Sequence, residues 1–381
     1  MARSALTRRL FTLHSWLGLA TGLLLLVMSL SGVVLVFEEE LDRALNPALL
    51  AVPVSGGSAS AAPAPPRLDA IFRAARARYP QPAFLRFRRL PAHAGQAVEV
   101  SVERRPSRWT FAYFDPQTAR WLGERDARSH FFGWLLGVHY SLWGGKSGEL
   151  TGALLGLMLL LSVSTGLVVY RKHVVPVLLF RQPINWRNWR TAASGLHRVV
   201  GVWSLIINLL MATSGVWMLR YTFLPETYQP EVVKALLPQP ALGVSYDTLY
   251  ARARRALPGL RPTGLRGPQA NAVPEVVVIG ALPGNPLFGE YSHSVTLDAR
   301  TGQVTQRNDL HSADPSVQAD ALLSTLHFGQ FGGLLTKIMW SIGGLSPALL
   351  SLTGFALWWR RHRSSRPRQP AIGQRAASQA A

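Results

Sequence analysis

The sequence predicts a membrane protein with four transmembrane helices in two parallel repeats, each repeat carrying a small periplasmic α+β domain. Three observations lead to this prediction: four long apolar segments, a one-sided distribution of charge, and a set of motifs that occurs twice. The chain has 381 residues, of which 48% are hydrophobic, and it contains no cysteine. Its mean hydropathy of +0.14 argues against a soluble nucleic-acid-binding protein, although the formal net charge is +20.

Four apolar segments are each long enough to cross a hydrocarbon core of about 30 Å as a helix. These spans are expected at 10–37, 150–170, 199–219 and 334–359. Arg8 and Arg9 precede the first segment, as in a signal peptide. Its apolar run is too long for one, however, and glutamates follow it where a cleavage site needs small residues. We therefore expect a retained span.

The charged residues predict the orientation of the spans. The segments 1–9, 171–198 and 360–381 hold 15 of the 40 Lys and Arg residues and none of the 20 Asp and Glu residues. By the positive-inside rule, these segments and both termini are cytoplasmic. The large segments 38–149 and 220–333 then face the periplasm, and the protein is expected in a bacterial inner membrane. Lipid is an expected partner and nucleic acid is not.

A histidine begins the first and the third span, and a Ser-Gly pair lies further along the same face of each helix. Eighteen residues, or five helical turns, separate histidine from glycine in both copies. The matching residues are His14, Ser31 and Gly32 in the first copy and His197, Ser214 and Gly215 in the second. A face of small residues ending in an imidazole suits a flat macrocycle whose metal the imidazole binds. Small residues also serve packing between membrane helices.

A second repeated motif surrounds the second and the fourth span. A histidine precedes each span, and a Thr-Gly pair ends 27 residues after it. The matching residues are His139, Thr165 and Gly166 in the first copy and His327, Thr353 and Gly354 in the second. His173 and His362 follow these spans, each just beyond two basic residues. We expect them at the level of the cytoplasmic headgroups.

The outward segments also repeat. In each, an amphipathic stretch (68–79 and 246–257) predicts a helix, and alternating apolar residues follow it. The alternation predicts strands over 97–102, 109–114, 274–279 and 292–297. The tetrapeptides that begin at Asp115 and Asp298 suit hairpin turns. Both copies start on the cytoplasmic side, so the repeats are parallel.

The four repeat-related histidines at span starts are the predicted ligands of two haem b groups. His14 and His197 are expected at the cytoplasmic side, and His139 and His327 at the outer side. Pseudo-two-fold symmetry would then place the members of each pair opposite each other. Without cysteine thiolates, two imidazoles on one metal favour b-type haem over a structural zinc site.

The other histidines leave one alternative open. His173 or His362 could replace His14 or His197 as a ligand, for example in a pair of His14 with His362. The remaining four have no repeat partner and are expected to be ordinary residues of the outward domains: His93, His130, His293 and His311.

These motifs resemble those of the PepSY-associated transmembrane proteins over most of residues 10–363. The length and layout are most similar to the FoxB-type inner-membrane siderophore reductases. This resemblance implies a haem-dependent oxidoreductase that acts in iron uptake. Such an enzyme would pass electrons across the membrane, reduce the ferric iron of a hydroxamate siderophore in the periplasm and release Fe²⁺.

The sequence contains neither a Gly-x-Gly-x-x-Gly nucleotide-binding motif nor a P-loop. Electrons are therefore expected from a cytoplasmic partner or a membrane quinol. Three alternative functions stay open. They are a quinol-linked di-haem cytochrome with another acceptor, a non-catalytic PepSY protein that binds or regulates a peptidase, and a metal or siderophore permease.

Overall fold

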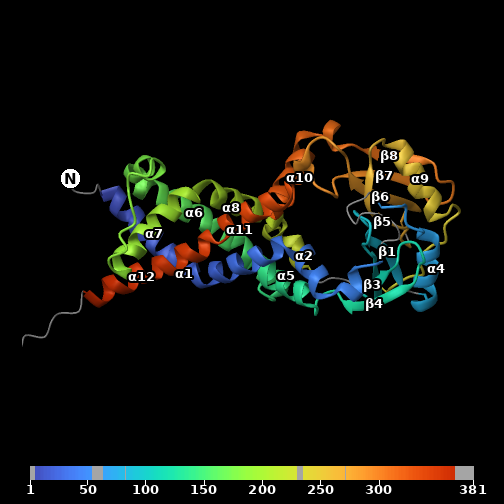
Figure 1. Ribbon diagram of the computed structural model, residues 1–381, viewed down its shortest axis with the longest axis horizontal. Coiled ribbons are helices and arrows are strands. Elements are labelled where there is room, and N and C mark those ends of the chain that lie inside the picture. Colours follow the sequence, from blue (N-terminus) through green and yellow to red (C-terminus); the bar gives the residue numbers. More distant parts are fainter. Residues whose placement is uncertain (1–4, 54–62, 82, 230–234, 271, 365–381) are drawn as a thin grey trace, which may run out of the picture.

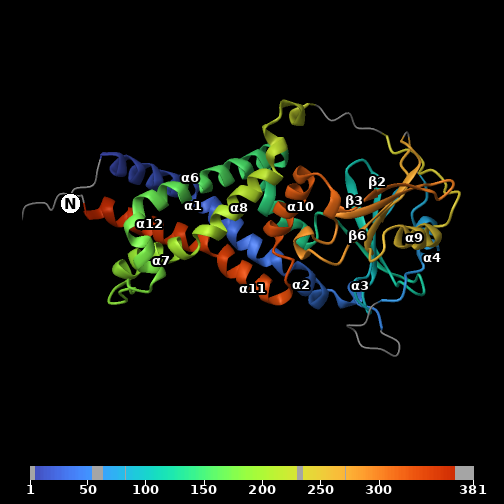
Figure 2. The same cartoon turned by 90° about the horizontal axis from the view of Figure 1, so that it is seen from above.

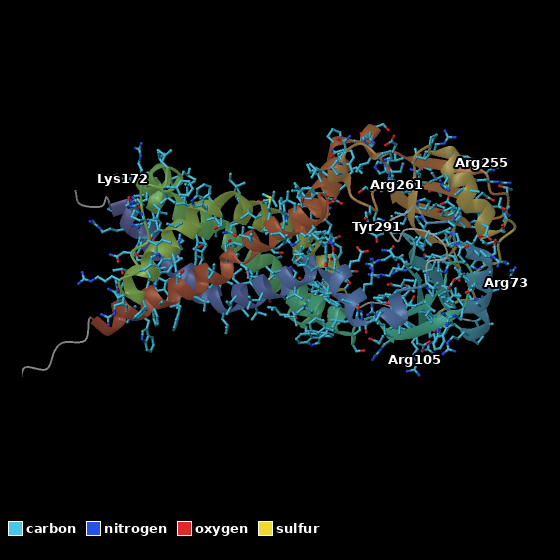
Figure 3. All side chains as sticks on the ribbon, in the orientation of Figure 1. Arg73, Arg105, Lys172, Arg255, Arg261 and Tyr291 are labelled. Atoms are coloured by element: carbon cyan, nitrogen blue, oxygen red, sulfur yellow. The ribbon has the colours of Figure 1, made fainter. Side chains whose placement is uncertain are left out.

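The structure, a computed structural model, describes residues 5–53, 63–81, 83–229, 235–270 and 272–364. A bundle of long helices forms one end of the molecule, and a sheet covered by two helices forms the other (Figure 1). Figure 2 shows the same two parts after a turn of 90°. Lys172 lies at the end of the bundle far from the sheet, whereas Arg73 and Arg255 lie at the far rim of the sheet domain (Figure 3).

Three helices of the bundle are long and apolar enough to cross a membrane, and a bent pair forms a fourth candidate span. The first repeat contributes α1 (Ala5–Val36) and α6 (Gly145–Leu178). The second contributes the bent pair α7 (Trp189–Trp203) and α8 (Leu205–Met218), followed by α11 (Gly333–Gly344) and α12 (Ser346–Ser364). The chain is therefore a membrane protein, as the sequence predicts.

One span of the second repeat is not the simple helix that the sequence predicts. The expected span 199–219 bends by 64° between α7 and α8, at Ser204. The expected span 334–359 lies within a single candidate membrane helix, Gly333–His362, in which only Leu345 separates α11 from α12. Asn208 links the bend to the start of α12. Its amide nitrogen donates to Ser204 Oγ (2.9 Å), and its amide oxygen accepts from Ser346 Oγ (3.0 Å). This buried network connects the bent span to the fourth span.

Small residues set the approach of the long helices. Gly22 of α1 faces Ser351 of α12, and Gly156 of α6 faces Val216 of α8. A side chain at Gly156 would come within 2.8 Å of that valine, so the glycine lets the two helices pack closely. Two shorter helices, α5 (Phe131–Ser141) and α10 (Pro315–Phe328), pack on the bundle where it meets the sheet domain. They carry His139 and His327.

The sheet domain contains one antiparallel sheet of eight strands, in the order β4-β3-β2-β1-β5-β6-β7-β8. The first repeat supplies β1 (Phe84–Arg89), β2 (Val98–Arg105), β3 (Arg108–Phe114) and β4 (Trp121–Asp126). The second supplies β5 (Arg261–Arg266), β6 (Glu275–Ala281), β7 (His293–Asp298) and β8 (Val304–Asn308). The sequence predicts a small domain in each repeat, but the two units form a single sheet in which Phe87 pairs with Leu265. This pairing covers the edge strands that separate domains would expose.

The helices and turns of the two units match each other. α4 (Leu68–Arg78) and α9 (Tyr246–Ala256) share one apolar core with the sheet, which includes Leu68, Ile71, Leu249 and Val276. Asp115 Oδ1 accepts from the amides of Gln117 and Thr118 (both 2.9 Å), and Asp298 Oδ1 accepts from those of Arg300 and Thr301 (2.9 and 2.7 Å). The predicted helices and hairpin turns are thus confirmed.

Candidate cofactor-binding sites

Two histidines meet inside the bundle at its end far from the sheet. His14 comes from α1 and His197 from α7, and their ring centroids are 6.2 Å apart with an angle of 81° between the ring planes. His14 Nδ1 donates to the carbonyl of Ser162 on α6 (3.0 Å) and lies 3.3 Å from Thr165 Oγ1. His197 Nδ1 lies 2.9 Å from Thr353 Oγ1 on α12. Both rings are thus oriented by the neighbouring span.

The other two repeat-related histidines meet at the end of the bundle next to the sheet. His139 of α5 and His327 of α10 have ring centroids 6.3 Å apart with an angle of 55° between the planes. His139 Nδ1 donates to the carbonyl of Met28 (2.9 Å) and lies 3.2 Å from Ser31 Oγ, both on α1. His327 Nδ1 lies 2.9 Å from Ser214 Oγ on α8.

The hydroxyl groups fix the tautomer of each ring. Ser214 donates its own hydroxyl proton to the carbonyl of Leu210 (2.6 Å), and Thr353 donates to that of Leu349 (2.7 Å). Their oxygens therefore accept the proton of the neighbouring Nδ1. The same holds for Ser31 and Thr165, which donate to carbonyls one turn back (2.8 Å each). In all four imidazoles Nε2 keeps its lone pair, which is the state that binds a metal.

The glycine of each motif makes room for an imidazole. A Cβ on Gly32 would lie 2.8 Å from His139 Cε1, and one on Gly166 would lie 3.1 Å from His14 Cε1. The matching contacts in the second repeat are looser, at 3.5 Å for Gly215 with His327 and 3.5 Å for Gly354 with His197. The sequence predicts that each Ser-Gly pair lies on the helix face of the histidine in the same span. The structure adds that each Ser-Gly or Thr-Gly pair lies against an imidazole from a different helix.

The spacing of both pairs fits two imidazoles on one metal. A metal–imidazole bond is about 2.0–2.1 Å long. With ring bonds of about 1.3–1.4 Å, a ring nitrogen lies about 1.2 Å from its centroid. Two imidazoles on opposite sides of one metal would therefore have centroids about 6.4 Å apart, close to the observed 6.2 and 6.3 Å.

A cavity surrounds the pair formed by His14 and His197. Its empty volume is about 1190 Å³, part of which is open to the outside. Small residues, including Gly18 and Gly201, line it together with apolar side chains from α1, α6, α7 and α12. Arg198 also lines it, and its Nε is buried without a hydrogen-bond partner among the described residues.

His173 and His362 do not enter either pair. His173 Nδ1 is 2.8 Å from the side-chain amide of Gln182, and His362 stacks on Trp358 with a centroid distance of 4.5 Å. The alternative pair of His14 with His362 does not form in this structure, because His197 occupies the place opposite His14. Among the histidines without a repeat partner, His130 caps α5 by accepting from the Gly133 amide (3.2 Å).

The two pairs lie near opposite ends of α1. His14 belongs to one pair, and Ser31, which holds His139, lies seventeen residues further along the helix. This is a rise of about 26 Å, close to the thickness of a hydrocarbon core. The arrangement therefore places one histidine pair near each end of α1, as two candidate metal-binding positions.

Comparison with known families gives one match. The sequence model described as the PepSY-associated TM region matches residues 11–361. No curated protein matches the chain significantly.

Proposed function

Because the chain belongs to the PepSY-associated transmembrane family, we propose that it is a di-haem oxidoreductase of the bacterial inner membrane. It would pass electrons outward to reduce the ferric iron of a siderophore and release Fe²⁺. The single observation that carries this proposal is the presence of two histidine pairs with matched spacing, each pair combining one imidazole from each repeat.

The residues of both pairs fit haem b. Each pair offers two neutral imidazoles with Nε2 lone pairs, and the chain has no cysteine for thiolate ligation or covalent attachment. Bound haem supplies a centre that takes up and gives off one electron at a time. His14 and His197 would hold the inner group, and His139 and His327 the outer group. A haem held by two imidazoles at each site would suit electron transfer rather than O₂ activation.

Arg198 gives further support for the inner site. Haem b carries carboxylates, and a guanidinium whose buried Nε has no hydrogen-bond partner among the described residues is a suitable donor for such a group. Its neighbour His197 is one of the two facing imidazoles. The side chain of Arg198 would orient the carboxylate edge of the cofactor within the cavity. The charge distribution supports an inner site on the cytoplasmic side, because His197 and the start of α7 lie within the acid-free segment 171–198.

The reaction would be a one-electron reduction of Fe³⁺ bound through hard oxygen donors. Fe²⁺ has a lower charge density and holds such ligands less tightly, so reduction frees the metal. The electron would enter at the inner site from a quinol or a cytoplasmic protein and leave at the outer site, near His139 and His327. The sheet domain would then lie in the periplasm, where a ferric hydroxamate siderophore is the proposed acceptor.

Absorbance spectroscopy tests the proposal directly. The purified protein is expected to be red, to contain two haems per chain, and to show b-type bands when reduced. Mixing the reduced protein with a ferric hydroxamate should reoxidise it and produce Fe²⁺, detected with a ferrous chelator. A colourless protein from haem-replete cells would refute the proposal and favour a non-catalytic, peptidase-binding role. Rapid reoxidation by other acceptors but not by ferric siderophores would indicate a quinol-linked cytochrome with a different acceptor.

A further inference from the structure

Two histidines and an aspartate that the haem sites do not use gather in the second unit of the sheet domain. His293 begins β7, and Asp309 and His311 lie at the start of η4 (Leu310–Ser312), which leads into α10. One nitrogen of each imidazole and one carboxylate oxygen all lie within 4.8 Å of one another. This is the only such group of three or more metal-ligand side chains found among the described residues.

The cluster is compact and partly enclosed. His293 is 1% exposed, and its ring stacks on that of His311 at a centroid distance of 5.2 Å. Phe288 closes one side, 5.2 Å from the His311 ring. Gly284 has a φ of +125°, and a Cβ there would lie 3.1 Å from His311 Nε2. A glycine with left-handed backbone therefore makes room for this imidazole.

The donor atoms already have the separations of ligands in a metal site. Asp309 Oδ1 lies 3.4 Å from His293 Nδ1 and 2.9 Å from His311 Nδ1. At a metal about 2.1 Å from each atom, these separations subtend angles of about 110° and 90°. Angles of this size occur in tetrahedral and octahedral coordination, so a cation would require little movement of these donors.

A turn-capping role explains the carboxylate but not the imidazoles. Asp309 Oδ1 accepts from the His311 amide (3.0 Å), as expected for a capping aspartate. The first repeat has the same cap, because Asp126 Oδ1 accepts from the amides of Arg128 and Ser129 (both 2.8 Å). Asp126 precedes Asp309 by the same 183 positions that separate Asp115 from Asp298.

The residues that correspond to the two imidazoles are different in the first repeat. At the same offset, Thr110 corresponds to His293 and Arg128 corresponds to His311. The turn therefore forms without imidazoles in one copy of the domain. In the second copy, two imidazoles lie beside the equivalent carboxylate, and the three side chains together form a set of possible metal ligands.

We propose that His293, Asp309 and His311 bind a divalent first-row transition metal ion. Two imidazoles and one carboxylate form a donor set that suits Zn²⁺ or Fe²⁺ and leaves positions for water or another ligand. The Leu310 amide now donates to His293 Nδ1 (3.1 Å), and the cation would replace it as the partner of that nitrogen. Binding through His311 Nδ1 would displace the proton that this nitrogen donates to Asp309, and a neutral imidazole would carry that proton on Nε2 instead. The proposal does not depend on the haem sites.

Equilibrium dialysis of the full-length, haem-saturated protein against Zn²⁺, followed by metal analysis, tests the site. The wild-type protein is expected to bind one zinc ion more than Asp309→Asn and His311→Gln, or to bind it at least tenfold more tightly. Asparagine keeps a capping oxygen, so Asp309→Asn should leave the turn intact. Asp126→Asn, the equivalent change in the first repeat, and His93→Gln should bind zinc like the wild-type protein.

Thermal unfolding gives an independent measurement. Zinc should raise the Tm of the wild-type protein and of Asp126→Asn, but not that of Asp309→Asn, because only a ligand bound to the folded state stabilises it. Equal zinc binding by the wild-type protein, Asp309→Asn and His311→Gln would overturn the proposal. Loss of binding in Asp126→Asn as well would also overturn it, since the effect would then be one of turn stability. Neither result would bear on the haem content.

Discussion

The two repeats build the same half-sites with different helices. In each repeat, the Ser-Gly pair of the first span holds the histidine that precedes the second span, and the Thr-Gly pair of the second span holds the histidine of the first. Yet α1 and α6 are continuous, whereas the first span of the second repeat bends by 64° between α7 and α8. The position of each imidazole therefore depends on the local contact between dipeptide and ring, and not on the straightness of the helix.

The largest expected effect tests whether each site needs both repeats. His139→Ala and His327→Ala should each remove the same proposed outer haem, because both imidazoles would be needed to hold it. His14→Ala and His197→Ala should each remove the inner haem. Haem content per chain and the reduced spectrum measure this, with His93→Ala as the control. Retention of both haems in His139→Ala, or loss of different haems in His139→Ala and His327→Ala, would contradict the pairing.

The ion pair between Asp42 and Arg125 in the first repeat should be sensitive to acid. Burial raises the pKa of Asp42 on α2 (Glu38–Leu45), but two hydrogen bonds from Arg125 of β4 (2.7 and 2.5 Å) more than offset this and hold the pKa below its usual value. The stabilisation is therefore fully present above about pH 4 and is lost as pH falls through the lowered pKa. The second repeat has Pro225 at the equivalent position and lacks this link.

Asp42→Asn should cost about 3 kcal/mol, because it leaves the half-buried Arg125 without its carboxylate. It should also flatten the dependence of Tm on pH below about pH 4. Glu39→Gln is the matched control, since the exposed pair of Glu39 with Arg43 contributes at most about 0.5 kcal/mol. If the Tm of Asp42→Asn still falls below about pH 4 as steeply as that of the wild-type protein, other carboxylates cause the pH dependence.

Alanine in place of the motif glycine should disturb the site more in the first repeat than in the second. Gly32→Ala would bring a Cβ within 2.8 Å of His139, whereas Gly215→Ala would leave 3.5 Å to His327. We expect Gly32→Ala to weaken retention of the outer haem by about tenfold or more, which corresponds to an overpacking cost of about 1–3 kcal/mol. Gly215→Ala should stay within a few-fold of the wild-type protein. Haem transfer to apomyoglobin measures this difference, and equal rates for the two variants would show that the tight contact in the first repeat does not matter.

The smallest expected effect concerns the hydrogen bonds of Asn208 at the bend between α7 and α8. Asn208→Leu introduces the residue found at the equivalent position of the first repeat, Leu25. It removes the hydrogen bonds with Ser204 and Ser346 and should lower stability by about 1 kcal/mol, as is usual for polar contacts between membrane helices. Thermal unfolding in detergent gives the value. A more stable Asn208→Leu protein would mean that these hydrogen bonds do not stabilise the packing of the two spans.

Much of the fold follows from patterns in the chain. Apolar length predicts the spans, alternation predicts β2, β3, β6 and β7, and the Asp-x-x-Thr motifs predict the hairpins between β3 and β4 and between β7 and β8. The outer strands β4 and β8 and the central strands β1 and β5 gave weaker signals. β1, for example, contains Arg86, Arg88 and Arg89 among its six residues. Those arginines are tolerated because the sheet and its aromatic neighbours cover them, as when Arg86 lies 4.4 Å over Trp109. Amino-acid composition alone does not reveal that neighbouring side chains cover these arginines.

The histidine cluster at His293 shows the same limit. His293 and His311 lie 18 residues apart and have no repeat partner, so the sequence predicts only ordinary residues there. Their approach depends on the pairing of β7 with β8, which brings the start of one strand next to the chain that follows the other. A comparison of the two repeats could have drawn attention to them, because the equivalent positions hold Thr110 and Arg128.

The sequence by itself determined the number of apolar segments, the duplication, the orientation expected from charge, and the four histidines that recur in it. These properties are periodic or compositional, so they can be read along one chain. The structure pairs His14 with His197 and His139 with His327, as the symmetry of the repeats predicts. Only the tertiary structure decided which helix holds each ring and that the two outward units share one sheet. These features arise from contacts between residues that lie more than a hundred positions apart, such as Ser31 with His139 and Phe87 with Leu265. The packing of the two repeats against each other fixes such contacts.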